Sequence, residues 1–142
     1  MLKILCIDFG AKRCGLAISD ELQMIGTPLR TVRTHELLAD IEYLLKSEAL
    51  EGIVIGKPKD LKGNETDASK LVTVFTKKLK GKFPDLNIWS EDERFTSKIA
   101  LQSMLEGNVP KNKRRDKSVI DKVSAAIILQ SFLDKRWSEN KK

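Results

Sequence analysis

The segment 4–10, Ile-Leu-Cys-Ile-Asp-Phe-Gly, constrains the fold more than any other part of the chain. It is an apolar run that ends in the carboxylate of Asp8, and a second apolar run, residues 14–18, follows after Lys12 and Arg13. This pattern predicts a buried strand, a tight turn and a returning antiparallel strand. A carboxylate at the end of a buried strand is costly unless it is paired or binds a cation. The rest of the chain must therefore supply partners for Asp8.

The other apolar segments predict an element order of β-β-β-α-β-α-β-α-α. Pro28 suits an edge strand because it cannot donate to a ladder, and an all-apolar strand bounded by Gly52 and Gly56 suits a sheet centre buried on both faces. We expect Thr34 to cap the first helix, and Asn64 to begin and Gly81 to end the second. The expected strands are 4–8, 15–19, 27–31, 52–56 and 87–91, and the expected helices are 34–45, 64–80, 96–105 and 118–137.

This order predicts a single α/β domain with a mixed sheet over residues 1–137, followed by a flexible tail at 138–142. No apolar run approaches the roughly 20 residues of a membrane span. The chain also enters a strand at once, without the pattern of a secretory signal. We therefore expect a cytoplasmic protein.

The scarcity of histidine and cysteine limits the chemistry. His35 is the only histidine, and Cys6 and Cys14 are the only cysteines. This excludes a zinc site with several His or Cys ligands and an HNH-type nuclease centre. The 26 Lys and Arg residues outnumber the 20 Asp and Glu residues, which favours a polyanionic partner. Chemistry in this protein must depend on carboxylates and cations.

Carboxylates from three separate elements are the candidates for that chemistry: Asp8, the acidic group 91–93, and Asp121. Strand ends from different elements converge at one sheet edge, so these groups could surround one cavity. Hard oxygen ligands of this kind suit Mg²⁺ or Mn²⁺, ions that activate water for phosphodiester hydrolysis. Each group also has a structural alternative. Asp8 could form a turn, the acidic group could be a solvated strand end, and Asp121 could complete an S-x-x-D helix cap with Ser118.

Three basic clusters lie beside these carboxylates in loops: residues 12–13, residues 57–62 and residues 111–117. Cations next to an acidic metal site would hold substrate phosphates against it. No aromatic residues alternate with them, so we expect recognition of the nucleic-acid backbone rather than base stacking on a platform. The candidates for nucleic-acid binding are Lys12, Arg13, Lys57, Arg94, Lys111, Lys113, Arg114, Arg115 and Lys117.

Four blocks of the sequence together resemble the YqgF/RuvX family, in family order and nearly from end to end. They are D-F-G-x-K-R-x-G-L-A-x-S-D at 8–20, G-x-P at 56–58 with Gly63, D-E-R-F-T-S at 92–97, and I-D-x-x-x-A-A at 120–126. The resemblance implies an RNase H-like fold related to RuvC, with sheet order 3-2-1-4-5, an antiparallel strand 2 and helices on both faces. Two departures are Lys57, where the family usually has an apolar residue, and Ser118, where RuvC-type resolvases carry a fourth carboxylate.

The resemblance also implies a bacterial nuclease that processes the 5′ end of pre-16S rRNA, with Asp8, Glu93 and Asp121 as its catalytic and metal-binding residues. We therefore expect an Mg²⁺- or Mn²⁺-dependent endonuclease that acts on pre-rRNA, with ribosomal particles as possible partners, as a monomer or a weak homodimer. One alternative is a Holliday junction resolvase acting on branched DNA, which would need a symmetric dimer. A second is a non-catalytic RNA-binding factor for ribosome assembly on a nuclease scaffold.

Overall fold

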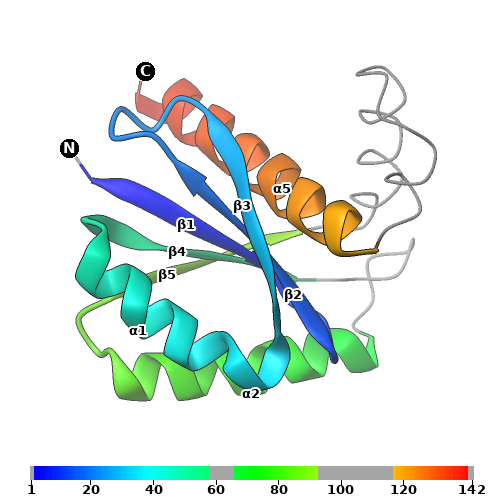
Figure 1. The fold of residues 1–142 in the computed structure, drawn as a ribbon. Helices are drawn as coiled ribbons and strands as arrows, with labels where there is room; N and C mark the ends of the chain where they lie inside the picture. Colours follow the sequence, from blue (N-terminus) through cyan, green and yellow to red (C-terminus); the bar gives the residue numbers. More distant parts are fainter. Residues whose placement is uncertain (1, 58–65, 93–116, 141–142) are drawn as a thin grey trace.

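A computed structural model describes residues 2–57, 66–92 and 117–140 of the chain. These residues form a sheet with helices on both of its faces (Figure 1). The strands are β1 (Lys3–Asp8), β2 (Arg13–Ser19), β3 (Gly26–Arg33), β4 (Leu50–Lys57) and β5 (Asn87–Asp92). The helices are the short 3₁₀ turn η1 (Thr34–Glu36), α1 (Leu37–Ser47), α2 (Asp67–Lys82) and α5 (Lys117–Asn140).

The five strands lie in the order β3-β2-β1-β4-β5. β1 pairs with β2 in antiparallel orientation and with β4 in parallel orientation, and β5 is parallel to β4. The predicted sheet order and the predicted antiparallel strand 2 are both confirmed. Because β1 is central, Asp8 at its last position lies at the middle of one sheet edge.

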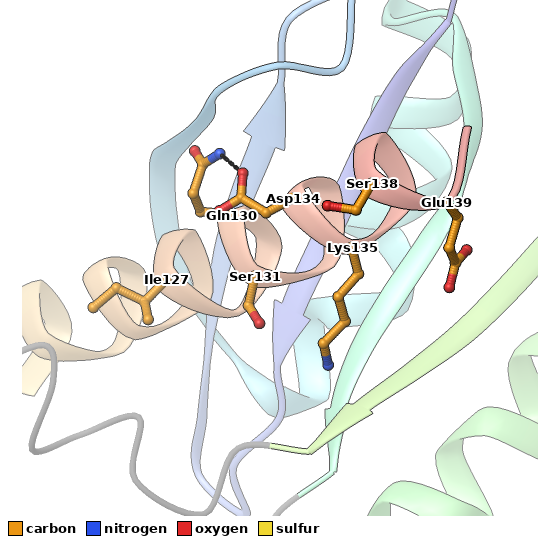
Figure 2. A pocket seen from close by; sticks show the side chains of 7 residues that line it. All are labelled: Ile127, Gln130, Ser131, Asp134, Lys135, Ser138 and Glu139. Carbon is orange, nitrogen blue, oxygen red and sulfur yellow. Dashed lines mark hydrogen bonds between the residues drawn. The ribbon is translucent and has the colours of Figure 1, made fainter. Parts of the chain in front are cut away.

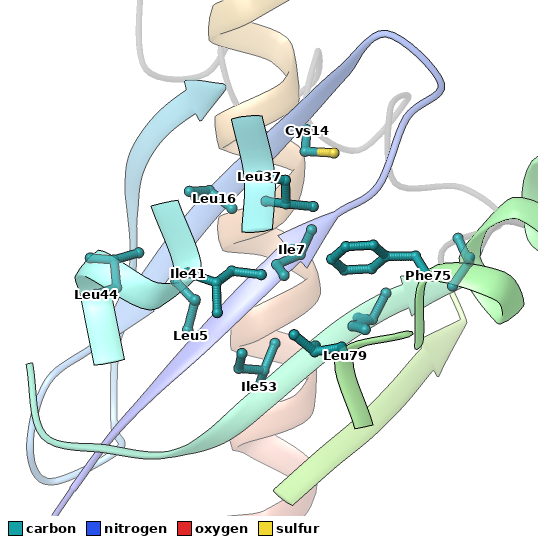
Figure 3. Packing of buried hydrophobic residues seen from close by; sticks show 12 residues of the cluster. Leu5, Ile7, Cys14, Leu16, Leu37, Ile41, Leu44, Ile53, Phe75 and Leu79 are labelled. Carbon is teal, nitrogen blue, oxygen red and sulfur yellow. The ribbon is translucent and has the colours of Figure 1, made fainter. Parts of the chain in front are cut away.

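Alternation along the strands separates the core into two halves. Leu5 and Ile7 of β1 face α1 and α2, and they pack with residues such as Ile41 and Leu79 (Figure 3). Ile4 and Cys6 face the opposite way and pack under α5. A strand buried on both faces reads as a continuous apolar run, which is why segment 4–7 carries no polar residue. By the same alternation, the side of the sheet that Asp8 faces is the α5 side.

The structure corrects three expectations about helix ends. Thr34 caps no helix, because its hydroxyl donates instead to the Gly10 carbonyl oxygen at 2.7 Å. Gly81 does not end α2, which continues to Lys82. The N-terminus of α2 is instead a capping box formed by Thr66 and Ser69.

The last helix also extends further than expected. We placed its end near Trp137 and a flexible tail after it, but α5 continues through Asn140. Residues 138–140 contain neither glycine nor proline, so nothing in them stops a helix. Residue Asn64 itself and the expected helix 96–105 lie outside the described residues.

Candidate active site

Asp8 lies in a row of residues that crosses four strands at the edge of the sheet. Its register partners are Gly15 on β2 and Gly56 on β4, and Gly56 in turn pairs with Glu91 on β5. Partners in register project their side chains to the same face of a sheet. Since both immediate neighbours are glycines, the Asp8 carboxylate is flanked by positions without side chains on the α5 side. On the β4 side, the neighbour of Asp8 is therefore Gly56, which places no side chain beside the carboxylate.

Gly15 also determines how closely α5 approaches this row. A Cβ atom at position 15 would lie 2.0 Å from the backbone carbonyl oxygen of Asp121, far inside contact distance. Only a glycine allows the helix backbone to rest on β2 at that point. The contact places the turn of α5 that carries Asp121 directly over Gly15, the residue that pairs with Asp8 on β2. Two of the three predicted carboxylates are thus brought to the same edge of the sheet.

Arg13 and Asp121 form an ion pair at this edge, with Nε and Oδ2 3.0 Å apart. The side chains remain 39% and 26% exposed, so the pair is accessible to solvent. We predicted Arg13 as a contact to nucleic acid and Asp121 as a metal ligand or a helix cap. Lys117 is already helical, so Ser118 does not occupy the N-cap position that the cap alternative required. The structure thus gives Asp121 a partner on the strand beside Asp8.

The pKa of the Cys14 thiol is affected by the carboxylates at this edge. Its pKa is raised chiefly because the residue is buried, and the negative charges of Asp8 and Asp121 raise it further. Hydrogen bonding to the Thr34 hydroxyl and the Gly10 carbonyl opposes the shift. Both carboxylates therefore act on the same buried sulfur.

Glu91 is the acidic residue of β5 that lies in the Asp8 row, but it already has a partner. The carboxylate is buried, at 8% exposure, and it forms an ion pair with Lys135, which reaches from α5 toward β5 (Figure 2). Strands lie about 4.8 Å apart, so two strand spacings separate Glu91 from Asp8. The ion pair therefore gives Glu91 a structural role.

The remaining candidates for nucleic-acid binding do not all lie together. Lys12 lines a basic hollow beside the β1–β2 turn, while Lys57 ends β4 and Lys117 begins α5. Glu93 follows the last residue of β5 in the sequence. It lies outside the described residues, as do the basic candidates Arg94, Lys111, Lys113, Arg114 and Arg115.

Asp8 and Asp121 fit part of a site for a divalent metal ion. Carboxylate oxygens are the ligands that Mg²⁺ and Mn²⁺ favour, and Asp8 and Asp121 bring two carboxylates to the same edge of the sheet. Within residues 2–57, 66–92 and 117–140, no group of three or more His, Cys, Asp or Glu side chains could hold a metal. A third carboxylate would have to come from outside these ranges, where Glu93 is the predicted ligand.

Sequence reasoning missed two features of the site. The first is the pair of glycines beside Asp8, Gly15 and Gly56. Their position next to Asp8 depends on how the strands pair, which cannot be read from the sequence. The second is the pair Arg33 and His35, which line the basic hollow together with Lys12. Their position after an edge strand resembled an ordinary solvated turn. A hollow of about 680 Å³ lies along α5, and the described residues that line it all belong to that helix and include none of the predicted site residues (Figure 2).

The sheet order, the helices on both faces and a carboxylate ending the central strand define an RNase H-like fold of the resolvase type. It is similar to a Fowlpox virus resolvase solved with Holliday junction DNA, with a TM-score of 0.57 and 12% identity over 95% of this chain and 99% of that one. It is also similar to T. thermophilus RuvC in complex with a Holliday junction substrate, with a TM-score of 0.55 and 13% identity over 97% of both chains. The predicted fold class is confirmed.

The chain belongs to the RuvX family, whose model, described as Holliday junction resolvase, matches residues 2–135. A relative from Christiangramia forsetii is 44% identical over 133 residues, covering 94% of this chain and 98% of the relative. One from Phocaeicola vulgatus is 42% identical over 136 residues, covering 96% and 98%. Both relatives carry the name "Putative pre-16S rRNA nuclease". These findings confirm the family resemblance and support the predicted class of hydrolytic nuclease.

Proposed function

We propose that this protein is a metal-dependent endonuclease that hydrolyses phosphodiester bonds at the edge of the sheet marked by Asp8. The observation that carries the proposal is the placement of Asp121 over Gly15, the glycine next to Asp8 in register. Two carboxylates at an accessible edge, with cations beside them, match what phosphodiester hydrolysis needs. Asp8 and Asp121 would hold the ion together with Glu93.

Each residue has a distinct part in the proposed reaction. A bound divalent ion would supply an activated water and stabilise negative charge on the phosphate. Asp8, on the central strand β1, would fix the position of the ion, and Asp121 would bind the same ion from α5. Arg13 and Lys12 hold phosphates of the substrate beside the carboxylates. Of the two, Arg13 alone must exchange a protein partner for a phosphate, because it is paired with Asp121.

We propose the 5′ end of pre-16S rRNA as the substrate, because relatives that match nearly the whole chain are named for that RNA. Ribosomal particles would then be partners, and the site of action would be the cytoplasm. No helix in the described parts of the chain is long and apolar enough to cross a membrane. A monomer or weak homodimer is sufficient for this reaction, because one phosphodiester bond is cut at a time.

The second candidate is resolution of branched DNA, which the description of the RuvX family model favours. Resolution needs two sites that cut symmetric strands, so it requires a two-fold dimer. The candidates separate by substrate and by oligomeric state in the presence of that substrate.

The experiment compares cleavage of a pre-16S 5′ fragment and of a four-way DNA junction, with and without Mg²⁺ or Mn²⁺. The variants are Asp8→Asn and the matched control Asp67→Asn, which alters a fully exposed carboxylate in the first turn of α2. We expect metal-dependent cleavage of the RNA by the wild type and by the Asp67 variant, and none by the Asp8 variant. Cleavage of the junction alone would replace the RNA assignment. Equal activity of Asp8→Asn would refute the proposed active site, and absence of any cleavage would favour an RNA-binding factor.

A further inference from the structure

An apolar hollow of about 320 Å³ lies below the β1–β2 turn, between that turn and helices α1 and α2. Its apolar lining comes from Phe9, Leu38, Leu71, Val74 and Phe75. The rings of Phe9 and Phe75 pack with their centroids 5.0 Å apart at its base. Leu71 and Val74 are 46% and 66% exposed, unusually high values for large aliphatic side chains at a concave site. The volume is at the lower end for small-molecule sites, which suits a single small planar group.

This hollow adjoins the basic hollow at the β1–β2 turn. The basic hollow has a volume of about 660 Å³ and is lined by Lys12, Arg13 and Arg33. The two hollows share Ala11, Thr34 and His35 in their linings. Arg13 reaches the other way, to Asp121. The cations at the β1–β2 turn therefore lie between the carboxylates, on the α5 side of the sheet, and the apolar hollow, on the side of α1 and α2.

The turn between the two hollows is held in place by specific hydrogen bonds. The Thr34 hydroxyl donates to the Gly10 carbonyl at 2.7 Å, and the Thr34 amide donates to the Lys12 carbonyl at 3.0 Å. These bonds tie the β1–β2 turn to the start of η1. The cations and the apolar walls are thus presented in a fixed relation, which lowers the ordering cost of binding.

We infer that the apolar hollow receives an unpaired nucleobase of the substrate strand, close to the phosphodiester that Asp8 cuts. The inference rests on the proposed function and adds to it the class of substrate. A nucleotide combines an anionic phosphate with a flat group of apolar faces, which matches a basic hollow that opens into an apolar one. Lys78 at the lining of the apolar hollow adds a further cation for the neighbouring phosphate.

The base must be unpaired because a base inside a duplex is stacked on both faces and cannot turn into a hollow without leaving the helix. Contact between a base and aromatic side chains is tolerant of sequence, since every base offers a flat face. The nuclease would then select junctions between paired and single-stranded RNA by shape. Backbone recognition alone would give no such preference.

The test measures binding of the full-length protein to three labelled RNAs by fluorescence anisotropy in EDTA, so that no cleavage occurs. The RNAs are a blunt hairpin, the same hairpin with a single-stranded tail at either end, and the tailed hairpin with abasic sites in the tail. We expect the tail to tighten binding about tenfold and the abasic tail to lose that gain. Because the tailed and the abasic RNA carry the same phosphates, their difference isolates the base.

The variant Val74→Glu places a charged group on the exposed wall of the hollow, and Leu22→Glu makes the same change at an exposed aliphatic side chain outside both hollows. We expect the Val74 variant to bind tailed and abasic RNA equally, while the Leu22 variant keeps the wild-type difference. Any added repulsion from the new charge acts on both RNAs and cancels in the comparison. Circular dichroism of both variants checks that they are folded.

Two results would overturn the inference: equal binding of tailed and abasic RNA by the wild type, or an unchanged difference in Val74→Glu. Either result leaves metal-dependent cleavage by the wild type intact, and then only the base hollow is wrong. If the wild type cuts no substrate but still prefers the tailed RNA, the proposed nuclease function fails and the base hollow stands.

Discussion

Nε of Arg13 lies 3.0 Å from Oδ2 of Asp121, although 108 positions separate the two residues in the sequence. The pair joins the strand that follows Asp8 to the helix that closes the other side of the site. It also means that a fixed positive charge stands beside a carboxylate assigned to metal binding. A divalent ion at Asp121 must therefore approach against the charge of Arg13 or move that side chain aside.

Replacing Arg13 by Gln should separate its two effects. Metal binding without nucleic acid should become several-fold tighter because a competing positive charge is removed, while RNA binding should weaken because a phosphate contact is lost. The pair is partly exposed, so stability should change by less than about 1 kcal/mol. Titration calorimetry with Mn²⁺ and binding assays in EDTA measure the two effects. Metal binding that is weaker in Arg13→Gln would show that Arg13 supports the ion rather than opposing it.

Gly15→Ala should damage both the fold and the site. The new Cβ would meet the Asp121 carbonyl oxygen at 2.0 Å, so α5 must shift away from β2. We expect a loss of about 1–3 kcal/mol in the free energy of unfolding and a large fall in cleavage. Gly81→Ala is the control, because a Cβ there meets nothing within 4 Å and the residue is helical. That variant should gain about 0.5–1 kcal/mol, and urea unfolding of both variants measures the difference. A stable, active Gly15→Ala would contradict the close approach.

The two acidic residues Glu91 and Glu93 should behave in opposite ways. Glu91 is buried against Lys135, so Lys135→Ala should cost about 1–3 kcal/mol by leaving a buried carboxylate without its partner. Glu91→Gln should keep metal-dependent cleavage, whereas Glu93→Gln should abolish it. Cleavage rates and unfolding midpoints of the three variants decide the matter. Loss of activity in Glu91→Gln at unchanged stability would move the third ligand to β5.

Acid should remove one stabilising turn at the end of β2. The Asp20 carboxylate accepts hydrogen bonds from the backbone amides of Ile25 and Met24, which lower its pKa. A carboxylate whose pKa is lower in the folded than in the unfolded protein stabilises the fold. For Asp20 this stabilisation is fully present at pH values above the pKa in the unfolded protein, 3.8. That stabilisation is lost as the pH falls through the lowered folded pKa.

Asp20→Ala should therefore be less stable than the wild type at neutral pH, and the two should converge in strong acid. Urea unfolding midpoints across this range measure the difference. Glu21→Ala, which removes the neighbouring exposed carboxylate, controls for the change in net charge. A difference between Asp20→Ala and the wild type that stays constant with pH would show that the hydrogen bonds do not depend on the ionised carboxylate.

Periodicity predicted most of the architecture because strands β1, β2 and β4 have clear burial patterns. The run 4–7 and the glycine-bounded run 52–56 are continuous apolar segments, and both are strands buried on two faces. The order of the strands came from the family resemblance, since pairing between distant segments leaves no local signal. Helix ends were less predictable because tertiary contacts compete for the capping groups. Thr34, for example, bonds to Gly10 rather than to its own helix.

The site was predictable in its residue types and less so in its partners. Asp8 stands out because a carboxylate after a buried strand needs an explanation. Asp121 was ambiguous in sequence because a helix cap and a ligand use the same side chain. Its ion pair with Arg13 and the contact of its backbone with Gly15 give it a place at the site. Gly15 could be read only as the start of a strand or as part of a family motif. Its function as the seat of α5 depends on a contact across more than 100 positions of the chain, to Asp121.

The position of α5 at the end of the described chain has a consequence for the protein during its own synthesis. Until α5 docks, one face of the sheet has no cover, and Ile4, Cys6 and Val54 remain exposed to solvent. Chains emerge from the ribosome N-terminus first, at about 5–20 residues per second, so Asp8 precedes its partner Asp121 by several seconds. A nascent chain that has not reached α5 therefore lacks Asp121, one of the three proposed catalytic carboxylates. The proposed site stays incomplete for as long as the ribosome is still synthesising that helix.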